Sequence, residues 1–128
     1  MGKILIVDDD ETFVEILSGY IRSHYPLLEV ETGVCPHTAL QDLCGNISLL
    51  LIELAKLDGD RLKTLEFARQ CGVDKNRVVI ISGRDAEYLH EQFPMGTCLA
   101  VLNKYEPKQK AVLDMIFTSL SKKAAAVI

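Results

Sequence analysis

The feature that most constrains the fold of this chain is a fivefold alternation of short apolar runs with helix-like stretches. The apolar runs are Lys3–Val7, Leu27–Glu31, Ser48–Ile52, Arg77–Ser82 and Cys98–Leu102. The first, third and fourth are nearly continuous Ile, Leu and Val, which is typical of strands that a parallel sheet buries on both faces. We therefore predict five strands in a single parallel sheet.

Helical periodicity fills the stretches between these runs. One helix face is indicated by the i, i+3, i+4, i+7 spacing of Phe13, Ile16, Leu17 and Tyr20. A similar stripe follows Pro107, which suits a first helical position, and consists of Val112, Met115, Ile116, Ser119 and Leu120. Weaker patterns predict helices over Pro36–Cys44, Asp60–Cys71 and Asp85–Gln92. Strand and helix thus alternate, and the fold class is α/β.

Length and charge limit what the chain can do. Its 128 residues make one domain, which we place at residues 1–121, with an alanine-rich helix end or tail over 122–128. The 18 acidic and 14 basic residues argue against a nucleic-acid-binding surface, which needs clustered Lys and Arg. The longest uncharged apolar stretch, 47–52, is too short to span a membrane, and the N-terminus does not resemble a signal peptide. We therefore expect a cytoplasmic location.

Polar side chains follow the apolar runs at the points where the strands would end. In a parallel sheet covered by helices, the functional crevice lies beyond the carboxyl ends of the strands. The residues at these ends are Asp8, Asp9, Asp10, Glu53, Ser82 and Lys104. We expect carboxylates, a hydroxyl and an amine to meet at this edge.

This set of groups suits a metal ion and a phosphoryl group. Asp8, Asp9 and Glu53 supply the oxygen ligands that Mg²⁺ prefers, with the Ala55 carbonyl as a further candidate. The Ser82 hydroxyl can donate a hydrogen bond to a phosphoryl group, and the Lys104 ammonium can neutralise its charge. The simpler alternatives are a strand-end hydroxyl for Ser82 and a solvated surface charge for Lys104.

The third aspartate has a simpler explanation of its own. Asp10, followed by Thr12, suits the N-cap of a helix, where acidic side chains complement the helix dipole.

The apolar runs and the polar residues at their ends follow one another in an order and spacing that resemble those of a response-regulator receiver domain of two-component signalling. The resemblance covers essentially the whole length of the chain. Lys3–Asp9 is similar to that family's first strand and acidic pair, and Val78–Gly83 to its fourth strand with the Ser/Thr that senses the phosphoryl group. Gly96–Lys104 is similar to the segment that leads to its lysine. The resemblance implies a three-layer, flavodoxin-like (βα)5 fold with strand order 2-1-3-4-5. It also implies phosphorelay signalling, in which a histidine kinase phosphorylates an Asp that ends the third strand, with Mg²⁺ as cofactor.

The sequence departs from that family at the acceptor. Glu53 stands in place of the Asp, and the added methylene moves the carboxylate by roughly 1.5 Å. A misplacement of about 1 Å can slow a positioned reaction on the order of 100-fold. We therefore predict an atypical, phosphorylation-independent receiver that is not an enzyme and binds Mg²⁺ weakly or not at all. Glu53 either mimics the phosphorylated form in part or pairs with Lys104 in a vestigial pocket, and Asp58 is a less favoured substitute acceptor.

Two further positions depart from the family pattern. Val101 stands at the aromatic switch position, so no ring is present to change rotamer there. Tyr105 follows the lysine where a proline is usual, and the loop after Glu53 is about two residues short and lacks its usual proline.

The resemblance implies protein partners, a histidine kinase or a downstream regulator. They would bind the face formed by Asp85–Gln92, Cys98–Leu102 and Pro107–Leu120, and a homodimer through it is left open. Tyr88 and Tyr105 are the candidate contacts, because aromatic residues are enriched at interfaces, whereas a third aromatic, Phe93, belongs either to the core or to this surface.

Two other functions compete with the receiver. Asp8-x-Asp10-x-Thr12 also resembles the nucleophile motif of haloacid-dehalogenase-type Mg²⁺-dependent phosphatases. Against this, no acidic metal-binding motif follows Lys104, because Asp114 falls within the helical stripe. The third reading is a pure protein-interaction module with a vestigial pocket.

Overall fold

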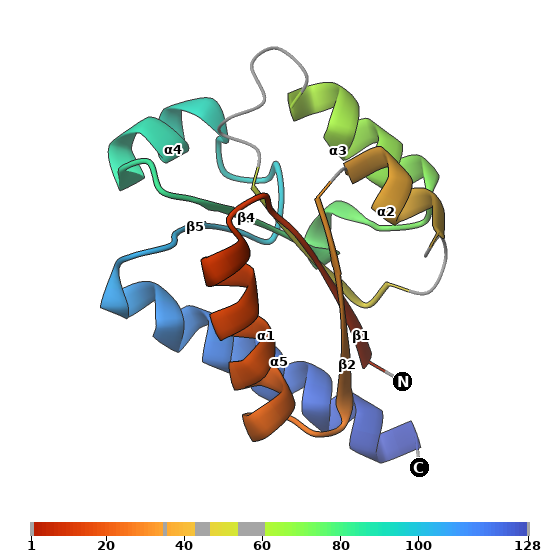
Figure 1. Ribbon diagram of the computed structural model, residues 1–128. Helices are drawn as coiled ribbons and strands as arrows, with labels where there is room; N and C mark the ends of the chain where they lie inside the picture. Colours follow the sequence, from red (N-terminus) through yellow and green to blue (C-terminus); the bar gives the residue numbers. More distant parts are fainter. Residues whose placement is uncertain (1, 35, 43–46, 54–60, 128) are drawn as a thin grey trace.

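The computed structural model describes residues 2–34, 36–42, 47–53 and 61–127 (Figure 1). All neighbouring strands pair in parallel in the order β2-β1-β3-β4-β5, which confirms the predicted fold class and strand order. The strands are β1 (Gly2–Val7), β2 (Leu28–Gly33), β3 (Leu49–Glu53), β4 (Val78–Ser82) and β5 (Ala100–Asn103). The α-helices are α1 (Glu11–His24), α2 (Pro36–Asp42), α3 (Arg61–Gln70), α4 (Ala86–Gln92) and α5 (Pro107–Val127), and a 3₁₀ turn, η1 (Lys75–Arg77), precedes β4.

Helices cover both faces of the sheet. Figure 1 shows α1 and α5 together on one face and α2, α3 and α4 on the other. The side chains of β1 alternate between these layers: Ile4 and Ile6 pack in the α1–α5 cluster, Leu5 and Val7 in the opposite one. Every residue of the inner strands β3 and β4 is buried, which is why their sequence runs are continuously apolar.

The ends of several elements differ from the sequence expectation. β2 extends past Glu31 to Gly33, because Thr32 and Gly33 continue the pairing with β1, although glycine does not favour a strand. Arg77 belongs to the 3₁₀ turn rather than to β4, and β5 begins at Ala100 rather than Cys98. Backbone pairing sets these limits, and apolar side chains alone do not reveal it.

The last helix is longer than its apolar stripe. α5 continues beyond Leu120 through Val127, so the alanine-rich end is helical at least to that residue. Alanine has the highest helix propensity, and this favours the extra turns. Among the described helices, α5 included, none combines the length and apolarity needed to cross a bilayer.

A polar contact joins α1 to α5. The hydroxyls of Tyr20 and Tyr25 both donate to Asp114 Oδ1, at 2.6 and 3.0 Å. The Lys110 ammonium lies 4.6 Å from the centre of the Tyr20 ring. The hydrogen bond to Asp114, followed by burial and the negative charge of Asp114, raises the pKa of Tyr20 to about 12.

We predict that two isoleucines on α1 differ sharply in their effect on stability. Ile21 is fully buried in the α1–α5 cluster, whereas Ile16 is 68% exposed. Ile21→Ala should lower the free energy of unfolding by about 2–5 kcal/mol, because it leaves a cavity. Ile16→Ala, the matched control on the same helix, should change it by no more than about 0.5 kcal/mol. Urea unfolding of both variants measures the difference, and equal losses would contradict the packing described.

A second prediction concerns the ionisation of Tyr20. Because its pKa is raised in the folded state, the proton on Tyr20 stabilises the fold fully below about pH 10, and this contribution is lost as the pH rises toward 12. Asp114→Asn should return the titration of Tyr20 toward an ordinary tyrosine value, because it removes the charge and weakens the hydrogen bond. Ring chemical shifts followed against pH measure this. Glu15→Gln, an exposed change on α1, serves as the control, and an unchanged midpoint in Asp114→Asn would refute the assignment.

Candidate functional site

The carboxyl ends of the strands bring Asp8, Glu53 and Lys104 together. Asp8 follows β1, Glu53 ends β3, and Lys104 follows β5. The Lys104 ammonium lies 2.5 Å from Asp8 Oδ2 and 3.7 Å from Glu53 Oε2. The three side chains are each exposed by 4% or less, so they form a buried ionic cluster, as the predicted meeting of strand ends required.

Lys104 is not the solvated surface charge that the sequence left as an alternative. Its backbone amide donates to the Ser82 carbonyl at 2.8 Å, which fixes the start of the loop against β4. Its ammonium also lies 4.8 Å from the centre of the Phe13 ring on α1. β3 and β4 separate β5 from β1 in the sheet, so the contact between Lys104 and Asp8 spans the strand ends.

The three successive aspartates have different environments. Asp8 Oδ1 accepts from the Asp10 amide at 2.9 Å, and the Asp8 amide donates to the Gly33 carbonyl at 3.1 Å, so both ends of this residue are held. Asp10 Oδ1 accepts from the Phe13 amide at 3.1 Å, which confirms the predicted N-cap of α1. Asp9 lies exposed at the surface. The local turn therefore separates side chains that are consecutive in sequence.

Glu53 makes the ion pair that the sequence suggested. Its side chain is 4% exposed and lies 3.7 Å from the Lys104 ammonium, although Lys104 is closer to Asp8. A third carboxylate, Asp10 Oδ2, lies 3.9 Å from the same ammonium. One cation is therefore shared among three carboxylates, two of them buried.

Ser82 and Val101 occupy the predicted strand positions. Ser82 ends β4 and is buried, and its hydroxyl oxygen accepts from the Arg84 amide at 3.0 Å, a local role at the strand end. Val101 pairs with Ile80 and packs, half-buried, against the apolar cluster that contains Leu89. A β-branched side chain packed in this way has few rotamers to exchange.

The aromatic residues of the predicted partner face separate into core and surface. Phe93 is buried in the core, so it offers no contact surface. Tyr88 is half-buried, with the Arg84 guanidinium 3.9 Å from its ring centre, and Tyr105 is 69% exposed. The Tyr105 hydroxyl lies 3.5 Å from Asp10 Oδ2, so this residue connects the surface to the ionic cluster.

Sequence reasoning missed two residues that support the site. Asn103 donates to the Arg84 carbonyl and accepts from the Tyr105 amide, both at 2.7 Å, and so ties the loop after β4 to the loop after β5. The available signal was a polar residue at the last position of β5. Phe13 was assigned only to the helical stripe, and its position beside an ammonium follows from how α1 packs.

The described residues fit a Mg²⁺ ion poorly. Among them, no group of three or more His, Cys, Asp or Glu side chains is placed to hold a metal. The Lys104 ammonium already contacts the buried carboxylates of Asp8 and Glu53, and an added cation would have to displace it. Ala55 and Asp58 lie outside the described residues. Weak Mg²⁺ binding through Asp8, Asp9 and Glu53 stays a prediction.

Comparisons with protein-family models and with curated proteins found no match to this chain. The fold and the ionic cluster are therefore the basis for a functional assignment.

We predict that Lys104→Met strongly destabilises the fold. The substitution keeps much of the side-chain volume but leaves two carboxylates buried without their cation, which should lower the free energy of unfolding by about 3–5 kcal/mol. Lys108→Met, an exposed change on α5, is the control and should stay within about 0.5 kcal/mol of the wild type.

A second substitution separates charge from packing. Adding Asp8→Asn to Lys104→Met removes one of the buried negative charges and should recover part of the lost stability, as chemical denaturation can measure. A loss below about 1 kcal/mol in Lys104→Met would show that the cluster is not the constraint described here.

Proposed function

We propose that this chain is an atypical receiver-like domain of phosphorelay signal transduction that acts through protein contacts without being phosphorylated. The observation that carries the proposal is the buried contact of Lys104 with Asp8 and Glu53. In the family that the sequence resembles, this lysine would neutralise an incoming phosphoryl group. Here, carboxylates of the chain itself already contact it.

The acceptor position supports the same conclusion. Glu53 is longer than Asp by one methylene, and its carboxylate is turned toward the Lys104 ammonium at 3.7 Å. It carries one negative charge, against roughly two on a phosphoryl group, so it reproduces the modified state only in part. With Val101 packed against the core, we propose that the domain holds one arrangement rather than switching between two.

The surface formed by α4, β5 and α5 is the proposed partner site. Tyr105 is exposed there, and the ring of Tyr88, a residue of α4, packs under the Arg84 guanidinium. Asn103 holds both loops in place. We propose that a kinase or a downstream regulator binds here, in the cytoplasm, and that Tyr105 transmits the state of the cluster through its contact with Asp10.

No observation favours the competing phosphatase. That activity would use Asp8 and Asp10, but Asp8 contacts the Lys104 ammonium and Asp10 Oδ1 caps α1. Asp114, the downstream carboxylate, accepts hydrogen bonds from Tyr20 and Tyr25. These residues therefore have structural roles, and we propose no turnover of phosphate esters, which incubation with p-nitrophenyl phosphate would test.

We predict that the wild-type domain takes no phosphoryl group from acetyl phosphate in the presence of Mg²⁺. Glu53→Asp should be labelled slowly, because shortening the side chain returns the carboxylate to the reach of an acceptor while Asp8, Ser82 and Lys104 stay in place. Intact-mass measurement after incubation detects the adduct on each protein.

Glu53→Gln is the matched control, since it keeps the length and removes the nucleophilic carboxylate. An adduct on the wild type that disappears in Glu53→Gln would overturn phosphorylation-independence. An unlabelled Glu53→Asp would favour the interaction module with a vestigial pocket over a receiver that lacks only its acceptor.

The partner surface generates a further prediction. Cross-linking to the domain identifies the partner protein. Tyr105→Ala and Tyr88→Ala should each weaken the binding of this partner by about 10-fold, because exposed aromatic residues contribute strongly to interfaces. Biolayer interferometry with the purified partner measures the change. Lys63→Ala on α3, an exposed residue on another helix, is the control, and unchanged binding in both tyrosine variants would place the interface elsewhere.

A further inference from the structure

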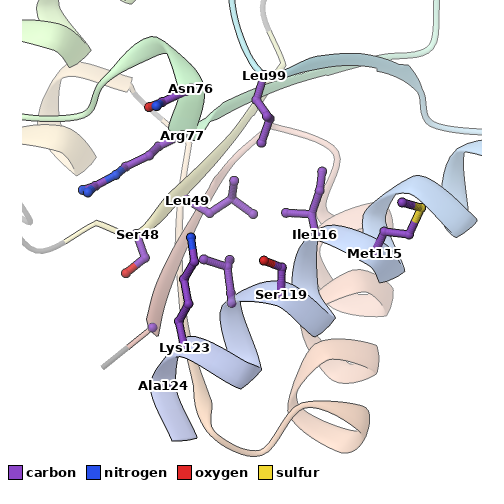
Figure 2. A pocket seen from close by; sticks show the side chains of 12 residues that line it. Ser48, Leu49, Asn76, Arg77, Leu99, Met115, Ile116, Ser119, Lys123 and Ala124 are labelled. Atoms are coloured by element: carbon purple, nitrogen blue, oxygen red, sulfur yellow. The ribbon is translucent and has the colours of Figure 1, made fainter. Parts of the chain in front are cut away.

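A groove of about 530 Å³ lies at the edge of the sheet opposite the ionic cluster, where the strands begin (Figure 2). Gly2 and Leu49 are the first residues of β1 and β3, and Arg77 and Leu99 directly precede β4 and β5. All four line one side of the groove. The ionic cluster and the aromatic contacts of the proposed receiver function use none of these four residues.

The other wall is formed by α5, from Met115 to Ala124. Its lining residues follow the spacing i, i+1, i+4, i+5, i+8, i+9 and are Met115, Ile116, Ser119, Leu120, Lys123 and Ala124. This stripe extends about 14 Å along the helix, or between two and three turns. The turns beyond Leu120, which extend past the apolar stripe seen in the sequence, supply the last two members.

The groove is apolar toward one end and carries basic side chains toward the other. Met115 and Leu99, which are 72% and 46% exposed, line it together with Ile116. Figure 2 shows these three side chains toward one end and Lys123 and Arg77 toward the other. Exposed apolar side chains of this size gathered in one hollow are typical of a contact surface.

The charges of the groove are opposite to those of the molecule. The chain carries 18 acidic and 14 basic residues, yet none of the described residues lining the groove is acidic, and two, Arg77 and Lys123, are basic. Neither forms an ion pair with another residue of the described chain. Two cations beside an apolar hollow fit a partner that is apolar on one face and acidic along its flank.

We propose that this groove docks an acidic amphipathic helix of a partner protein. A helix of three or four turns would place apolar residues on Leu99, Met115 and Ile116, and its acidic flank near Arg77 and Lys123. This is the helix-in-groove mode of recognition, with anchors at i, i+3, i+4 and i+7. Methionine suits such a site because its flexible side chain adapts to different contacts.

A second copy of the chain fits the groove less well. Its α1 presents Glu11 and Glu15, but Ile16 is the large apolar side chain exposed on that helix. One anchor does not fill a hollow lined by three or more apolar residues. The α1 helix of a second copy is therefore a poorer match to the groove than a separate acidic helix with several apolar anchors.

The test uses two synthetic helical peptides of about 14 residues as probes. Both carry Leu at i, i+3, i+4 and i+7; one has Glu along the flanks of this stripe and the other has Lys. Fluorescence anisotropy with the full chain should show the acidic peptide binding at least about 10-fold more tightly than the basic one. Equal affinities would overturn the proposal.

Charge reversal locates the binding. Arg77→Glu combined with Lys123→Glu should weaken the acidic peptide by about 10-fold or more and strengthen the basic one. Lys63→Glu with Lys122→Glu makes the same change in net charge at exposed positions outside the groove, and should have a much smaller effect. An equal loss in both double variants would show general electrostatic attraction and refute a docked helix.

Two further measurements cover the remaining outcomes. If the groove variant does not fold, amide shifts of the wild type on peptide addition decide the question: changes at Leu99, Ser119 and Lys123 support the groove, and changes confined elsewhere overturn it.

Analytical ultracentrifugation of the chain alone should give the monomer mass. Self-association that the groove variant abolishes would assign the groove to a second copy and overturn the proposed partner.

Discussion

The contact between the Lys104 ammonium and the Asp8 carboxylate is the interaction on which the functional edge of this molecule depends. It joins groups from β5 and β1, which β3 and β4 separate in the sheet, and both side chains are almost fully buried. Burying charges costs solvation energy, which only close pairing and further hydrogen bonds offset. Asp8 has both, because its second carboxylate oxygen accepts from the Asp10 amide. The cluster therefore links the carboxyl ends of β1, β3 and β5.

Short polar contacts connect Lys104 with residues at the surface. Asp10 begins α1 and approaches Lys104, and the Tyr105 hydroxyl approaches Asp10 from the surface. Asn103 ties Tyr105 to Arg84, which covers the Tyr88 ring. A series of contacts of 4 Å or less thus connects the Lys104 ammonium with the proposed partner surface. The ionic cluster and the proposed partner surface are therefore parts of one contact network.

The groove at the other edge has no part in this network, and this follows from the architecture. In a parallel sheet all strand ends of one kind meet at one edge, so the two edges of the same sheet carry unrelated side chains. Arg77 and Leu99 meet the Met115–Ala124 part of α5 where strands begin, and Lys104 and Asp8 meet where strands end. The groove and the ionic cluster therefore share no residues, although the groove includes α5 residues within the Pro107–Leu120 segment of the proposed partner surface.

The sequence by itself determined the α/β class, because short, continuously apolar runs such as Leu49–Ile52, typical of strands buried on both faces, alternate with helix-like stretches. It also determined that Asp8, Glu53 and Lys104 would meet, since parallel strands end at the same edge, and that Asp10 would cap a helix. The strand order 2-1-3-4-5 came from the resemblance to receivers, because spacing along a chain does not say which strands are neighbours.

Only the tertiary structure decided that Lys104 is buried and closer to Asp8 than to Glu53. It alone also showed that Phe93 is core and that Asp114 joins α5 to two tyrosines. The physical reason is that local patterns fix backbone periodicity, whereas burial, reach and partner choice depend on side chains brought together from distant parts of the chain.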